Sequence, residues 1–382
     1  MSPVLTAIPP SHPLRVLSWN VNGLTHYIKR KKVLSYLQSK RADIALLQET
    51  HLNDLESSKL QHDWVGRVIY SSHTSPSEEG GGPSRKCGVA ILLRKSLSAT
   101  IIKTWSDAEG RYVFAKLKIG ARVLCVGSVY APTGIKRSFL LGLNRTITEI
   151  GASQYLIGGD WNLTRDAIMD RTGPVDSGNN ADRVLLDDVI KDHVLTDHWR
   201  LTHPTEKDYT FLSPVHGTQS RLDYFLVSHK LIATIQDSRI LPAALSDHAP
   251  ISTSLNMGTA SPGRKPWRMP IHRYRAPQGR SQLQEHVSTY FETNAGSVTS
   301  QRVLWAASKA TVRGQLMRDA ALANAQRVAK QVGLEDRIRT LTRLYTSHPT
   351  PTTRHDLEVT KMELNTLNTS KAEFALRAEE RR

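Results

Sequence analysis

Apolar runs of strand length alternate with apolar positions of helical spacing over the first two thirds of the chain. The strand-like runs are rich in β-branched residues and lie at 15–19, 44–48, 88–93, 122–129, 155–158, 224–227 and 251–255. Steps of three and four separate the apolar residues between two of these runs, at Leu140, Leu143, Ile147 and Ile150, and similar spacing recurs over 185–190. Strands buried on both faces and separated by helices predict a layered α/β core.

The composition changes near residue 258, where prolines, glycines and basic residues mark a linker. Beyond it a helical pattern covers 281–346, and a Pro- and Thr-rich break follows at 347–353. We therefore predict four segments, namely a disordered N-terminus (1–13), an α/β domain (14–257), a basic Pro/Gly linker (258–280) and a helical extension (281–382).

The last part of the extension has an approximate heptad pattern, interrupted by two polar residues, at Leu357, Leu364, Leu367 and Phe374. A short coiled coil over 354–378 is therefore one prediction, and a monomer with a generic helical extension is the other.

The chain is strongly basic, with a formal net charge of +16. Such an excess indicates a polyanionic partner such as nucleic acid, or an anionic membrane surface; a solvated basic surface is the alternative. No apolar run is long enough to span a bilayer, so we expect no membrane-embedded part. Residues 1–13 lack the pattern of a secretory signal, and the two cysteines, Cys87 and Cys125, form no disulfide framework. These features fit a nuclear or cytosolic protein that is not secreted.

Six short polar blocks adjoin the strand-like runs. They lie at 18–23, 47–50, 129–132, 158–162, 221–224 and 246–248. Together they supply carboxylates, carboxamides, a phenol and an imidazole, a set that suits a divalent cation and a phosphodiester.

Glu49 follows the run 44–48, so its carboxylate is expected in the crevice at the strand ends, where ligands bind in α/β folds. A hard cation such as Mg²⁺ takes oxygen ligands and keeps several waters, so one or two protein carboxylates suffice. Asn20 and Asn22 end the preceding strand at the same edge. Each residue alone fits an exposed turn as well.

Asp160 and Asn162 follow another strand, where the carboxylate can take a proton from water and the amide can donate to a phosphoryl oxygen. An ordinary turn is the alternative. Asp223 stands in a strand, where a charge costs free energy unless it is paired. We predict that it accepts a hydrogen bond from His248 and favours the protonated imidazole. A core histidine beside a structural carboxylate is the alternative.

In kind and order, these blocks resemble those of the endonuclease/exonuclease/phosphatase superfamily. These metal-dependent enzymes include apurinic endonucleases, exonuclease III and the endonuclease domain of LINE-type (non-LTR) retrotransposons. The resemblance covers about residues 14–257. It implies a four-layered, DNase I-like α/β-sandwich, in which two mixed β-sheets pack face to face between helices, followed by the helical extension.

The resemblance also implies roles for single residues. It suggests catalytic roles for Tyr130, Asp160, Asn162, Asp223 and His248. It places a metal environment, with Mg²⁺ expected and Mn²⁺ as a substitute, at Asn20, Glu49, Asp160, Asn162, Asp247 and His248. It suggests DNA contacts at Asn22, Arg221 and Ser246. Repair enzymes often carry Asp at the position where this chain has Asn22. Because of this departure, a second metal ligand is not expected at Asn22.

Three features favour the retrotransposon branch of the superfamily. Residues 197–204 and 208–213 resemble the LINE pattern of a Trp-Arg pair, a His-Pro pair and a Tyr-Thr-Phe strand. The loop 213–220 that follows has no aromatic residue, whereas repair enzymes tend to carry an aromatic stretch that shapes an abasic pocket. The basic extension is similar to the linker that precedes reverse transcriptase in LINE proteins.

We therefore expect a Mg²⁺-dependent DNA endonuclease that leaves a 3′-hydroxyl and a 5′-phosphate and nicks target DNA for retrotransposition. Double-stranded DNA is the expected partner, selected by the loops at 74–86, 165–183 and 213–220, and RNA is a candidate partner of the extension. Three alternatives stay open. They are an apurinic endonuclease or exonuclease III-like repair nuclease, a phosphatase of the same fold, and an inactive nucleic-acid-binding remnant.

Overall fold

The computed structural model describes residues 12–73, 87–134, 136–173, 180–213, 217–258, 267, 269, 274, 277–297 and 300–379. Residues 1–11 of the predicted disordered N-terminus, the loop 74–86 and most of the predicted linker lie outside these ranges.

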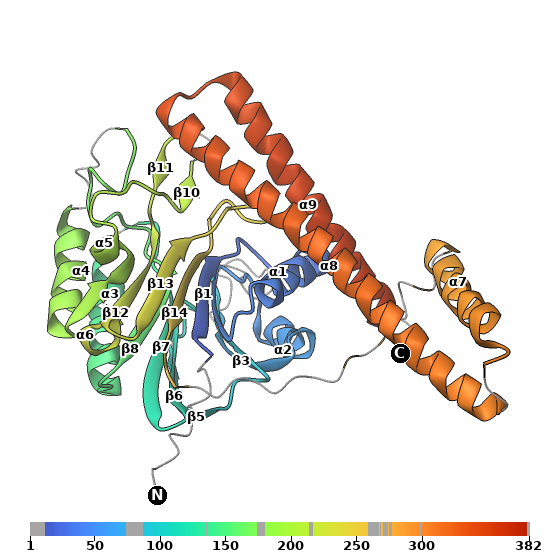
Figure 1. Cartoon of the computed structure of the whole chain (residues 1–382). Coiled ribbons are helices and arrows are strands. Elements are labelled where there is room, and N and C mark those ends of the chain that lie inside the picture. Colours follow the sequence, from blue (N-terminus) through green and yellow to red (C-terminus); the bar gives the residue numbers. More distant parts are fainter. Residues whose placement is uncertain are drawn as a thin grey trace, which may run out of the picture.

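Two six-stranded sheets pack face to face (Figure 1). The first has the order β13 (Ile235–Ile240), β14 (Ile251–Leu255), β1 (Leu14–Asn20), β2 (Ile44–Gln48), β4 (Val89–Arg94) and β3 (Gly66–Ser71). The second has the order β5 (Ala99–Ser106), β6 (Tyr112–Ile119), β7 (Arg122–Tyr130), β8 (Tyr155–Asp160), β12 (Asp223–Ser228) and β9 (Leu195–Asp197). Both sheets are mixed, because β1 pairs with β2 and β7 with β8 in parallel while the other neighbours are antiparallel. A separate two-stranded hairpin joins β10 (Phe211–Leu212) to β11 (Gln219–Ser220).

Helices cover the outer faces of both sheets. These helices are α1 (Tyr27–Ser39), α2 (Asp54–Asp63), α3 (Arg137–Ile150) and α4 (Asn180–Asp192), and short helices occur at α5 (His198–Thr202) and α6 (His229–Ile232). Buried apolar side chains fill the spaces between the layers, and alternate residues of one strand serve different layers. Leu46 of β2 belongs to the cluster between the sheets, whereas its neighbour Leu47 packs with Leu34 of α1. The predicted four-layered sandwich is confirmed.

The apolar pattern predicted most of the central strands but missed all four edge strands of the two large sheets. Every predicted strand is present, as are the helices around Leu143 and Leu186. The unpredicted strands β3, β5, β9 and β13 lie at sheet edges, whereas the unpredicted β6 lies between β5 and β7. An edge strand keeps one side open to water, so its sequence needs no continuous apolar run. The predicted loop 165–183 is also too long at its C-terminal end, because α4 begins at Asn180.

The extension forms three helices, α7 (Pro277–Asn294), α8 (Gln301–Ser347) and α9 (Pro351–Glu379). The predicted helical pattern over 281–346 corresponds to α7 and α8, with an interruption between Asn294 and Gln301. The predicted break near 347–353 separates α8 from α9, which lie side by side as a hairpin across the domain (Figure 1). None of the helices in the described residues combines the length and the apolar character needed to cross a membrane.

The helical hairpin has its own buried cluster. Leu334 and Ile338 of α8 pack against Leu357 and Leu364 of α9, and Ala244 of the α/β domain packs against the same cluster. Two of the apolar heptad positions that suggested a coiled coil, Leu357 and Leu364, are therefore buried within this chain.

Polar contacts also join the hairpin to α1. Lys40 Nζ lies 2.6 Å from Glu335 Oε2, and both side chains are largely buried. Lys32 Nζ donates to Asn365 Oδ1 over 3.0 Å. The second half of α8 and the first half of α9 are thus docked on the α/β domain.

We expect Leu364→Ala to loosen this docking. Leu364 is 0% exposed, and truncating such a side chain leaves a cavity that costs about 2–5 kcal/mol. Hydrogen exchange of the α8 and α9 amides should therefore accelerate. Met362→Ala, at a neighbouring position that is 61% exposed, is the matched control and should change exchange little. Equal protection in the two variants would contradict a docked hairpin.

Candidate active site

The predicted polar residues meet at one edge of the sandwich because of strand register. Asn20 and Gln48 are paired at the ends of the parallel strands β1 and β2, and Tyr130 and Asp160 are paired at the ends of β7 and β8. Asp223 begins the antiparallel strand β12 opposite Asp160. The carboxyl ends of both parallel pairs therefore bring their side chains together.

Asn20 connects the two sheets at this edge. Its Nδ2 donates to Glu49 Oε1 over 2.9 Å and to Asp160 Oδ2 over 2.8 Å, although these carboxylates follow strands of different sheets. Its Oδ1 accepts from the backbone N–H of Asn22 over 3.0 Å. Since Asn20 is 1% exposed and all of its polar atoms are engaged, it orients the two carboxylates.

Asp160 is buried and hydrogen-bonded on both oxygens. Its Oδ1 accepts from the backbone N–H of Asn162 over 2.9 Å, in a turn where Asn162 has φ of 46°. The Asn162 amide donates to the carbonyl of Ala131 over 2.8 Å, which fixes its orientation. Burial, opposed by His248 and reinforced by Asp223, raises the pKa of Asp160 to about 7. A carboxyl group with such a pKa is suited to accept a proton near neutral pH.

The predicted hydrogen bond between Asp223 and His248 is present, with 2.8 Å between His248 Nδ1 and Asp223 Oδ2. His248 Nε2 lies 3.8 Å from Asp160 Oδ2. Burial disfavours the charged ring, but the negative charges of Asp223 and Asp160 outweigh it and raise the pKa of His248 to about 10. His248 is therefore an imidazolium at neutral pH. The indole of Trp19 donates to the His248 carbonyl over 3.0 Å and holds its backbone in place.

Glu49 is the anionic group at the partly exposed side of this cluster. Burial alone would raise its pKa, but hydrogen bonds from His51, Asn20 and Tyr130 outweigh burial and lower it to about 2. His51 Nε2 lies 3.2 Å from Glu49 Oε2. Burial and the charge of Glu49 raise the pKa of Tyr130, so its phenol is a neutral donor. Our sequence analysis missed His51, which stands two residues after Glu49 on the same turn.

The model of the Endonuclease/Exonuclease/phosphatase family matches residues 17–248, which is more than half of the chain. The chain belongs to this family. The site described above lies at the strand ends of the endonuclease/exonuclease/phosphatase domain.

Two kinds of relatives share this domain. A 149 kDa protein of transposon TX1 from Xenopus laevis is 29% identical over 259 residues, which cover 66% of this chain and 19% of the relative. The DNA repair nuclease APEX1 of Danio rerio is 29% identical over 268 residues, which cover 63% of this chain and 82% of the relative. A probable RNA-directed DNA polymerase of the Drosophila melanogaster transposon X-element is 25% identical over 249 residues, 25% of its own length. The chain thus spans a quarter or less of these transposon proteins.

Solved structures confirm the fold of the domain. AP endonuclease LMAP from Leishmania major superposes with a TM-score of 0.53 at 20% identity, covering 64% of this chain and 88% of that protein. The catalytic domain of Xenopus laevis APE2 superposes with a TM-score of 0.52 at 22% identity. The superposition covers 63% of this chain and 91% of that domain. At this identity the superpositions show a common fold.

The exposed rim of the endonuclease/exonuclease/phosphatase site contains Asn22, Ser246 and Asp247. Asn22 Nδ2 donates to Asp247 Oδ1 over 3.2 Å, and Ser246 Oγ donates to the carbonyl of Asn20 over 2.8 Å. Lys29 also reaches this rim, where its Nζ donates to the Asn22 carbonyl over 2.6 Å. Burial lowers the pKa of Lys29, and the nearby charges of Asp247 and Glu49 oppose this. The basic run at 29–32 thus begins at the site.

The oxygen ligands around Glu49 fit a hard divalent cation. Glu49 offers an ionised, partly exposed carboxylate, and one or two such groups suffice for Mg²⁺. Ligand atoms of Asp160, Asp223 and His248 also lie within 4.8 Å of one another. All three of these residues are buried, however, and His248 Nδ1 is bound to Asp223, whereas Glu49 is partly exposed. Glu49 is therefore the better candidate for the cation site.

The structure corrects the expected DNA contact at Arg221. Its side chain is 1% exposed, with Nε 2.8 Å from Asp170 Oδ1 and Nη2 2.7 Å from Asp197 Oδ2. The guanidinium also lies 5.2 Å above the ring of Trp199. A side chain enclosed in this way cannot reach DNA; instead it ties the start of β12 to neighbouring loops.

We expect Arg221→Ala to destabilise the domain strongly. The substitution leaves the carboxylates of Asp170 and Asp197 buried without their main partner, which costs about 3–5 kcal/mol. Urea denaturation measures the free energy of unfolding. Arg239→Ala is the control, because its ion pair with Asp237 is exposed and contributes about 0–1 kcal/mol. Equal losses in both variants would contradict a structural role for Arg221.

The same network should make stability depend on acid. Burial alone would raise the pKa of Asp170, but Arg221 and Arg200 outweigh it and hold the pKa below its ordinary value. A carboxyl group with a depressed folded pKa stabilises the protein above about pH 4, and this contribution is lost as the pH falls through the lower folded value. We therefore expect Asp170→Asn to show a weaker loss of stability on acidification than the wild type. Asp237→Asn, on the surface, should keep the wild-type acid dependence of the urea midpoint.

Proposed function

We propose that this chain is a Mg²⁺-dependent endonuclease that hydrolyses a phosphodiester of double-stranded DNA to a 3′-hydroxyl and a 5′-phosphate. One observation carries the proposal. At one edge of the sandwich, the buried Asp160, whose pKa is raised by burial, lies 3.8 Å from Nε2 of His248, and the Nδ1 of this histidine is bound to Asp223. A proton acceptor beside a fixed cation is suited to activate water against an anionic phosphate.

In this mechanism Asp160 orients the attacking water and accepts its proton. His248 donates from Nε2 to a non-bridging phosphate oxygen, while Asp223 holds its Nδ1. The amide of Asn162 and the phenol of Tyr130 are further donors at the same edge. All of these donors are held in position before substrate binds, so little reorganisation accompanies the build-up of charge.

Glu49, oriented by Asn20 and His51, would hold the divalent cation, with Asp247 nearby on the rim. A bound Mg²⁺ or Mn²⁺ supplies Lewis-acid stabilisation of phosphate oxygens.

A role in retrotransposition is supported by the similarity to the TX1 and X-element proteins and by the aromatic-free sequence of the loop after Phe211. A repair function is the second candidate, because APEX1 is equally similar in identity. Nuclear location and RNA binding by the extension stay predictions.

A nicking assay separates these candidates. The full chain is incubated with supercoiled plasmid, with an intact duplex and with a duplex that contains one abasic site, each with Mg²⁺ and with EDTA. Nicking of plasmid and intact duplex that EDTA abolishes supports the proposal. Cleavage of abasic duplex alone supports the repair candidate. Absence of nicking with Mg²⁺ and with Mn²⁺ would favour an inactive remnant.

We expect Asp160→Asn to lower the nicking rate by roughly 10²–10⁴-fold, because the amide cannot accept the proton. Affinity for duplex should change little, since in this mechanism Asp160 acts on the attacking water and makes no contact with the DNA. Asp188→Asn is the control, because this substitution removes the same charge at an exposed position of α4. Wild-type nicking by Asp160→Asn would refute the assignment.

A further inference from the structure

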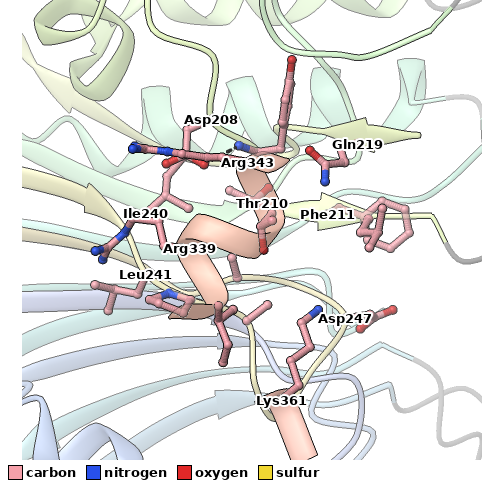
Figure 2. A pocket seen from close by; sticks show the side chains of 17 residues that line it. Asp208, Thr210, Phe211, Gln219, Ile240, Leu241, Asp247, Arg339, Arg343 and Lys361 are labelled. Atoms are coloured by element: carbon pink, nitrogen blue, oxygen red, sulfur yellow. Dashed lines mark hydrogen bonds between the residues drawn. The ribbon is translucent and has the colours of Figure 1, made fainter. Parts of the chain in front are cut away.

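The helical hairpin brings cationic side chains to the rim of the proposed active site. Lys361 of α9 and Asp247 line one pocket, and Figure 2 shows the two side chains next to each other on its rim. Arg339 and Arg343 of α8 line the same pocket. Asp247 is in turn hydrogen-bonded to Asn22 at the site. A segment far away in sequence therefore completes one side of the catalytic edge.

The tip of the hairpin is also attached to the β10–β11 strands. Thr346 Oγ1 donates to Gln219 Oε1 over 2.5 Å, and Arg343 Nη2 lies 3.4 Å from Glu206 Oε1. With the buried cluster around Leu364 and the ion pair of Lys40 with Glu335, these contacts hold the hairpin at three places on the domain. Its position is built into the fold.

A groove of about 180 Å³ separates the β10–β11 strands from the hairpin. Leu212 and Gly217 form one wall, and Tyr345, Arg354 and Lys361 belong to the other, with Asp247 at the catalytic end. The groove thus lies between the β10–β11 hairpin and the α8–α9 hairpin, with Asp247 at its catalytic end. Figure 1 shows these two hairpins next to each other.

The cations on the helical wall can exchange their present carboxylate partners for a phosphate. Arg354 pairs with Glu358 over 3.1 Å, but the two side chains are 58% and 59% exposed, so the pair is weak. Lys361 lies near the carboxylates of Glu358 and Asp247. An incoming polyanion that releases counterions can therefore compete for both cations.

We propose that the docked helical hairpin is part of the DNA-binding surface, with Lys361 and Arg354 contacting backbone phosphates of the duplex beside the scissile bond. The proposal rests on the proposed function and extends the substrate surface beyond the family domain. Duplex DNA is favoured over RNA as the ligand because the groove that both cations line reaches Asp247 at the catalytic edge, where the cut strand must lie.

Binding of a fluorescent duplex to the full chain in the Asp160→Asn background, measured by anisotropy over a range of salt, tests this surface. Lys361→Ala and Arg354→Ala should each raise Kd roughly eightfold at about 0.1 M salt and reduce the salt slope by about 0.9. Lys361→Arg should keep the wild-type slope, because it retains the charge. Arg302→Ala and Arg318→Ala, on exposed positions in the first half of α8, are the matched controls and should change Kd less than about twofold.

Unchanged Kd and slope in the groove variants, or equal losses in the controls, would overturn the proposal. The same anisotropy measurement is made with a fluorescent RNA. If the groove variants lose affinity for the RNA but not for the duplex, the proposal is overturned in favour of RNA. Arg354 is exposed, so Arg354→Ala keeps the test valid if Lys361→Ala disturbs docking. Nicking by the wild type is scored separately. If the chain binds duplex without cutting it, the proposed endonuclease function is refuted. The comparison of the variants' Kd values still tests whether the helical hairpin contacts DNA.

Discussion

The side-chain amide of Asn20 is the contact on which the site depends. Two sheets that pack through apolar side chains have no intrinsic reason to align their polar ends. Asn20 supplies one, because its Nδ2 donates to Glu49 after a strand of the first sheet and to Asp160 at the end of a strand of the second. Behind it, Gln48 Nε2 donates to Ser128 Oγ over 2.9 Å, a second hydrogen bond that crosses between the sheets in the dry core. Both bonds fix the register of one sheet against the other at the catalytic edge.

The charges of the domain follow one electrostatic rule, which is that a buried ion needs a partner. In the site, His248 lies between Asp223 and Asp160, and the mutual attraction keeps the imidazole protonated. Away from the site, Arg221 and its aspartates obey the same rule with a structural result. The difference lies in access, since the first cluster faces the partly exposed Glu49 while the second is enclosed by aromatic rings.

The helical extension changes the shape of the catalytic edge. Its second half is anchored by apolar side chains around Leu364 and by Lys40 with Glu335, and it ends beside β11. The family domain supplies the chemistry and one wall of the groove, and the extension supplies the other wall. In the proposed function, the extension thus contributes to substrate binding.

The sequence by itself determined the elements and the chemistry. Strand-length apolar runs located the central strands, and polar residues at their ends located Glu49, Asp160 and His248, because strand periodicity and strand termination are local properties. The sequence also predicted that Asp223 has a hydrogen-bond partner, because burying an unpaired charge in a strand costs free energy in any fold. The four edge strands, the inner strand β6 and the interruption between α7 and α8 were not predicted. Edge strands lack a continuous apolar run because one of their sides stays open to water.

Only the tertiary structure decided which side chains of equal chemistry face the site. Arg221 and Lys29 are both cations next to predicted blocks, yet one is enclosed by aspartates and the other reaches the rim. Lys361 stands more than a hundred residues from Asp247 in the sequence and lines the same pocket. Such choices depend on long-range packing, which sets the direction of each side chain and the partners within its reach, and no local pattern encodes them.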